Sequence, residues 1–67
     1  MEINVKAVRL AMVNKGMSLK QLAKAAHVSE CTAARYAKAG GNGTPATLYK
    51  IGRALGVKPS SLVVDQQ

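Results

Sequence analysis

The chain has 67 residues, with ten Lys and Arg against three Asp and Glu, a formal net charge of +7, and neither Trp nor Phe. This length predicts one domain, residues 1–67, whose core is built from aliphatic side chains and Ala on closely spaced helices. So strong a positive charge on so small a body favours a polyanionic partner, with nucleic acid the first choice.

Several classes of protein are excluded by what the sequence lacks. The single cysteine, Cys31, rules out an internal disulfide, as is typical of a reducing cytoplasm. No apolar run approaches the roughly 20 residues that span a bilayer, and no signal peptide is evident. One histidine, one thiol and scattered carboxylates suit neither catalysis nor a metal site. We therefore expect a cytoplasmic protein that is not an enzyme and needs no cofactor, metal, small-molecule ligand or membrane.

The first predicted element is a helix from Val5 to Gly16. Val8 and Met12 follow Val5 at helical spacing and predict its buried face. Leu10 and Val13 lie away from that face, and either the last helix or a second copy of the chain would cover them. Residues 2–4 are extended and could pair with residues 63–65.

The second and third predicted helices lie within residues 19–38 and are joined by a tight turn. Ser18 and Gln21 have the spacing of a capping box, which predicts the start of the second helix. This helix places Leu22 and Ala26 on one face, and His27 and Val28 then turn the chain.

The third helix begins after Ser29, a good N-cap residue. Ala33 and Tyr36 face inward with Leu22 and Val28. The outward stripe combines short and basic side chains that could lie deep in a DNA major groove: Cys31, Ala34, Arg35 and Lys38.

The glycine-rich run at residues 40–43 ends the third helix, and Thr44 followed by Pro45 predicts the start of the fourth. Gly56 ends the fourth helix, and Pro59 opens a short fifth helix over residues 60–64. Leu48, Ile51 and Leu55 form the buried stripe of the fourth helix. These elements predict an all-α fold, a compact bundle of five short helices with a helix-turn-helix in the second and third.

Residues 15–36, KGMSLKQLAKAAHVSECTAARY, resemble the Cro and lambdoid-repressor family, also called Xre. Residues 44–62, TPATLYKIGRALGVKPSSL, are similar to the fourth and fifth helices of that family, so the resemblance covers about residues 5–63. It implies a lambda-repressor-like domain that binds DNA. This chain departs from the family at Leu19, where Gln is frequent, and at His27, where Gly is usual. Its loop at residues 40–43 also lacks a basic residue for the minor groove.

A third helix in the major groove presents its first turns to base edges. The predicted base-contacting residues are Ser29, Glu30, Cys31, Thr32, Ala34 and Arg35. Arg35 suits guanine, although it could instead hold a phosphate or pair with Glu30. Glu30 could accept from a cytosine amino group or orient Arg35. Phosphates are predicted to contact the backbone amides that open the second and fourth helices. The side chains predicted to contact phosphates are those of Ser18, Lys20, Lys24, Lys38, Asn42 and Thr44.

The sequence therefore predicts a sequence-specific, double-stranded DNA-binding transcriptional regulator, Cro- or repressor-like, of phage or mobile-element type. A homodimer on a palindromic operator is expected, because one recognition helix contacts few base pairs. The candidate dimer residues are Leu10, Val13, Leu62, Val63 and Val64. The alternative is an antitoxin-type module that binds a toxin partner as well as DNA.

Overall fold

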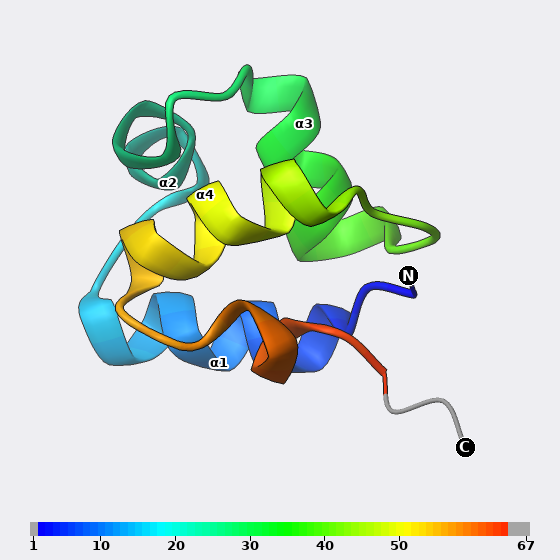
Figure 1. The fold of residues 1–67 in the computed structure, drawn as a ribbon. Helices are drawn as coiled ribbons and strands as arrows, with labels where there is room; N and C mark the ends of the chain where they lie inside the picture. The colour runs from blue at the N-terminus through cyan, green and yellow to red at the C-terminus, as the bar shows by residue number, and fades with distance from the viewer. Residues whose placement is uncertain (1, 65–67) are drawn as a thin grey trace.

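The computed structural model describes residues 2–64 and is entirely helical apart from short connections (Figure 1). In chain order its elements are α1 (Val5–Lys15), α2 (Leu19–Ala26), α3 (Glu30–Ala34), the π-helical turn η1 (Arg35–Ala39), α4 (Pro45–Leu55) and the 3-10 turn η2 (Pro59–Leu62). In Figure 1, α4 crosses the middle of the molecule, with α1 below it and α2 and α3 above it. The all-α fold predicted from the sequence is confirmed. Each helix of residues 2–64 is too short or too polar to cross a membrane.

The helices begin where local side-chain caps predict. The Asn4 side chain accepts from the Ala7 amide at 3.1 Å before α1. At the start of α2, Ser18 Oγ accepts from the Gln21 amide at 3.2 Å, and Gln21 Oε1 accepts from the Ser18 amide at 2.8 Å. This reciprocal pair is the predicted capping box.

Left-handed residues end three of the helices. Gly16 follows α1 with φ 66° and Gly56 follows α4 with φ 72°, as the sequence predicts. His27 follows α2 with φ 59° and is the only non-glycine residue at positive φ among residues 2–64. The Val28 amide there donates to the Ala23 carbonyl at 3.0 Å, which closes a Schellman motif.

The core is aliphatic and rich in alanine. Its largest fully buried side chains are those of Leu22, Leu48, Ile51, Leu62 and Val8. The buried alanines Ala23, Ala26, Ala33 and Ala37 let α2, α3, η1 and α4 approach closely, which compensates for the absence of large aromatic side chains. The inward face predicted for the fourth helix is confirmed.

Two predictions fail at the C-terminal end. Leu62 is only 1% exposed, so its side chain belongs to the core and is not available to a second copy. The last element is a 3-10 turn that ends at Leu62 and not a helix through Val64. The cause is pairing with the N-terminal segment: the Asn4 amide donates to the Leu62 carbonyl at 2.8 Å, and Ile3 forms an antiparallel bridge with Val63.

The N-terminal segment is paired on two sides. The bridge between Ile3 and Val63 confirms the predicted contact, whereas Asp65 lies outside the described residues. Glu2 also bridges to Asn42, and the Ile3 amide donates to the Gly41 carbonyl at 2.8 Å. This second pairing has no signal in the sequence, and it fixes the glycine-rich loop beside the start of α1.

Candidate nucleic-acid interface

The third helix consists of α3 continued by η1, and Ser29 caps its start. Ser29 Oγ accepts from the Thr32 amide at 3.1 Å and donates to Thr32 Oγ1 at 3.0 Å. These two bonds leave Glu30 and Cys31 on the first turn, where both are exposed. Ser29 is therefore engaged within the helix and can offer only its remaining lone pair to a ligand.

The third helix divides into an inward and an outward face as predicted. Ala33, Tyr36 and Ala37 are buried, and Arg35 and Lys38 are exposed together with Glu30 and Cys31. Thr32 and Ala34 are half-buried at the margins. The exposed face of the first turns thus combines one carboxylate, one thiol, small side chains and one guanidinium, with no large apolar group to hold a partner away.

Arg35 makes a contact that the sequence did not suggest. Its Nη2 donates to the backbone carbonyl of Asn42 at 2.9 Å, across the glycine-rich loop. A guanidinium has five N–H groups, so this bond leaves donors free to reach a base or a phosphate. The contact holds the Arg35 side chain against the loop that carries Asn42. In this structure Arg35 therefore bonds to the loop backbone and not to Glu30.

The third helix widens into a π-helical turn over η1. The Gly40 amide donates to the Arg35 carbonyl at 2.7 Å, five residues back. Gly40 has φ 78°, and a Cβ there would lie 3.0 Å from Val5 Cγ2 on α1. The helix therefore ends against α1 at a glycine. Turns of this kind are frequent at functional sites, and here one begins at Arg35 itself.

Tyr36 connects the third helix to the start of α4. Its ring is 3% exposed, which confirms the predicted core position, and its hydroxyl accepts from the Thr44 amide at 3.0 Å. Gly43 passes so close that a Cβ there would be 2.7 Å from the Tyr36 oxygen. This contact fixes the N-cap residue of α4 relative to the third helix.

All six residues predicted to contact phosphates are exposed: Ser18, Lys20, Lys24, Lys38, Asn42 and Thr44. The hydroxyls of Ser18 and Thr44 cap α2 and α4, and Thr44 Oγ1 accepts from the Thr47 amide at 3.3 Å. Both helix starts carry the partial positive charge of the helix dipole, which favours an anion. Within residues 2–64, no charged side chain is buried, and no three His, Cys, Asp or Glu side chains gather into a possible metal site.

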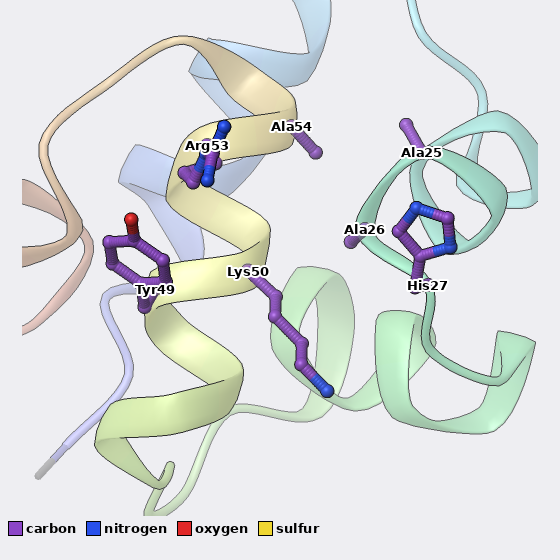
Figure 2. Close-up of a pocket in the computed structure, with 7 residues that line it drawn as sticks. All are labelled: Ala25, Ala26, His27, Tyr49, Lys50, Arg53 and Ala54. Atoms are coloured by element: carbon purple, nitrogen blue, oxygen red, sulfur yellow. The ribbon is translucent and has the colours of Figure 1, made fainter.

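A basic hollow of about 370 Å³ lies between the C-terminal end of α2 and the outer face of α4 (Figure 2). His27 lines the α2 side, and Lys50 and Arg53 line the α4 side. The small side chains of Ala26 and Ala54 lie between the two helices. Arg53 also lies 5.8 Å from the centre of the Tyr49 ring. The hollow lies at the opposite end of α2 from the Ser18 cap, and none of its lining residues is among the predicted DNA contacts.

Comparison with known proteins agrees with this geometry. Residues 5–62 match the family described as Helix-turn-helix, of the Cro/C1 and Xre-like type. No curated protein matches the chain, and no solved structure does. The match includes the capped α2, the left-handed turn at His27, the third helix and α4. The chain therefore belongs to the Cro/C1-type, Xre-like helix-turn-helix family, whose domains bind DNA and are not enzymes.

Proposed function

We propose that the protein is a transcriptional regulator that binds a specific operator in double-stranded DNA, with its third helix in the major groove. The observation that carries the proposal is the exposed face of that helix. Its small side chains allow the backbone to approach the bases, and Arg35 is the only long cationic side chain on its first two turns.

Each base-contacting residue has a chemical role in this proposal. Arg35 donates to guanine O6 and N7, a contact worth about 1 to 3 kcal/mol of discrimination. Cys31 and Ala34 contact thymine methyl groups, and Glu30 accepts from a cytosine amino group. Ser29 and Thr32 lie at the margins of this surface. The hydrogen bond from Arg35 to the Asn42 carbonyl supports the role, because it restricts the guanidinium before DNA arrives.

The phosphate contacts place the domain on the duplex without specifying sequence. Ser18 and Lys20 act at the start of α2, and Asn42 and Thr44 act at the start of α4. Lys24 and Lys38 add positive charge. Tyr36 supports this arrangement, since its bond to the Thr44 amide sets the spacing between the third helix and the start of α4.

A homodimer is part of the proposal, because a single helix contacts too few base pairs for useful specificity. Two copies would bind half-sites of a palindrome about one helical turn apart. With Leu62 buried, we assign the dimer contact to Val63 and Val64, which are half-buried beside Ile3. Leu10 and Val13, also predicted for this contact, lie on α1 among cations and suit another partner. The regulator would act as a repressor of phage or mobile-element type, in the cytoplasm where it meets the operator.

Selection from a randomised duplex DNA library at near-physiological salt tests the proposal. An enriched palindrome, changed or lost with Arg35→Ala and not restored by Arg35→Lys, is the expected result, because Lys cannot donate bidentately. Arg53→Ala is the matched control: it removes the same charge from α4 and should leave the palindrome unchanged. Binding that is only salt-sensitive and enriches no sequence would contradict a specific operator.

A further inference from the structure

Helix α1 carries apolar residues on two opposite sides. Val8 and Ala11 are buried against the core, as a helix on a small domain requires. Leu10 is nevertheless 55% exposed and Val13 75% exposed, so η2 does not cover them, and the first of the two alternatives that the sequence left open is wrong. These two residues are three apart on α1, so their side chains are neighbours and form an exposed apolar strip. The outer side of α1 therefore lacks a partner within the described chain.

Two hollows extend along this outer side and share residues. One, of about 470 Å³, is lined by Val5, Lys6, Arg9, Leu10 and Val13. The other, of about 290 Å³, is lined by Arg9, Met12, Val13, Met17, Leu19, Ala37 and Lys38. Because Arg9 and Val13 line both, the two shallow hollows are neighbours that meet at these side chains, and we name them together the α1 groove. Its floor includes two methionines, whose flexible side chains adapt to different apolar surfaces.

The charges around the α1 groove are of one sign. Lys6, Arg9 and Lys38 line it, and neither hollow contains an Asp or Glu. A partner with negative charge beside an apolar strip would therefore be complementary in both respects.

A second copy of the chain fits the α1 groove poorly. It would bring the same cations and a further formal charge of +7. A stable interface also needs about 600 to 800 Å² from each partner, which is a large share of the 4374 Å² that this molecule exposes. Such an area would extend well beyond Leu10 and Val13 and would place like charges together.

We propose that the α1 groove binds an acidic amphipathic helix of another protein. Its apolar residues, at spacings of three and four, would contact Leu10, Val13 and the methionines, as amphipathic helices do in apolar grooves. Its Asp and Glu residues would lie beside Lys6, Arg9 and Lys38. Of the residues that line the α1 groove, only Lys38 is also a predicted phosphate contact, so the groove and the proposed operator surface meet at this one side chain.

A designed peptide supplies the test. The probe is a capped helix of about 20 residues, long enough to be helical alone, with Leu at positions i, i+3, i+4 and i+7 and Glu beside them. Titration into the isotopically labelled protein, followed by amide chemical shifts, should perturb α1, Met17 and Lys38. Leu10→Gln and Val13→Gln should each weaken binding about tenfold, from the apolar area lost. Tyr49→Gln removes another large exposed apolar side chain, on α4, and should leave binding unchanged.

The controls separate this helix from other occupants. A peptide with Lys in place of Glu should bind at least tenfold more weakly, and equal binding would overturn the acidic partner. Perturbations around Lys50 and Arg53 alone, or equal losses in all three Gln variants, would show only general attraction to a cationic protein. A concentration-dependent doubling of mass, abolished by Val13→Gln, would assign the groove to a second copy and overturn the proposal.

Discussion

Replacing Tyr36 by Phe removes one oxygen atom and keeps the ring that fills the core. The Tyr36 hydroxyl accepts from the Thr44 amide at 3.0 Å, and the side chain is 3% exposed. Since the ring remains, no cavity forms, and the cost comes from the Thr44 amide, which loses its acceptor under the tightly packed Gly43. A partly buried donor left without an acceptor costs about 1 to 2 kcal/mol. For a domain of this size the melting temperature should fall by about 5 to 15 °C.

Urea denaturation followed by circular dichroism measures this difference directly. The free energy of unfolding should fall while the dependence on urea stays the same, because the surface exposed on unfolding does not change. Tyr49→Phe is the matched control, since Tyr49 is 54% exposed, and its effect should stay within about 0.5 kcal/mol. If Tyr36→Phe also stays within that range, the contact between Tyr36 and Thr44 does not stabilise the fold and our reasoning is wrong.

Three further predictions concern glycine, backbone strain and charge. Gly43→Ala should lower the free energy of unfolding by about 1 to 3 kcal/mol, because the new Cβ would be 2.7 Å from the Tyr36 oxygen; a native-like urea midpoint would contradict this clash. At position 27, where φ is 59°, His27→Gly should be slightly stabilising and His27→Val destabilising by about 1 kcal/mol or more, as judged from urea midpoints. A valine variant as stable as the native chain would refute the strain. Lys20→Gln should reduce the slope of log affinity against log salt by about 1 on an operator duplex, whereas Lys58→Gln should not change it; equal slopes for the two variants would remove Lys20 from the phosphate contacts.

The sequence predicts helix boundaries well in this chain because the relevant signals are local. The capping box of Ser18 and Gln21 and the N-cap at Thr44 involve residues three apart, whose bonds form in any helix that starts there. The sequence predicts that the chain turns at His27 and Val28, and the structure has this turn, with His27 at φ 59°. Local chemistry thus determines where these helices begin and end.

Contacts between distant segments explain what could not be predicted. The π-helical turn depends on Gly40 meeting Val5 of α1, a pair far apart in the sequence. The bond between Arg35 and the Asn42 carbonyl depends on the path of a glycine-rich loop. Leu62 was assigned to the surface because its burial follows from pairing between the two ends of the described chain. The predicted base and phosphate contacts remain predictions; Thr32 and Ala34 are half-buried, and the other side chains of the two sets are exposed.

The third helix keeps the residues that hold it in place apart from the residues that it presents to solvent. Ser29, Ala33, Tyr36 and Ala37 cap or anchor it, whereas Glu30 and Cys31 are exposed on its first turn. Substitutions at the two exposed positions therefore carry little cost in stability, since surface changes usually stay within about 0.5 kcal/mol. A lineage of such regulators could acquire new operators one base contact at a time while the fold stays intact. A library randomised at these two positions should accordingly contain mostly folded proteins with diverse DNA preferences.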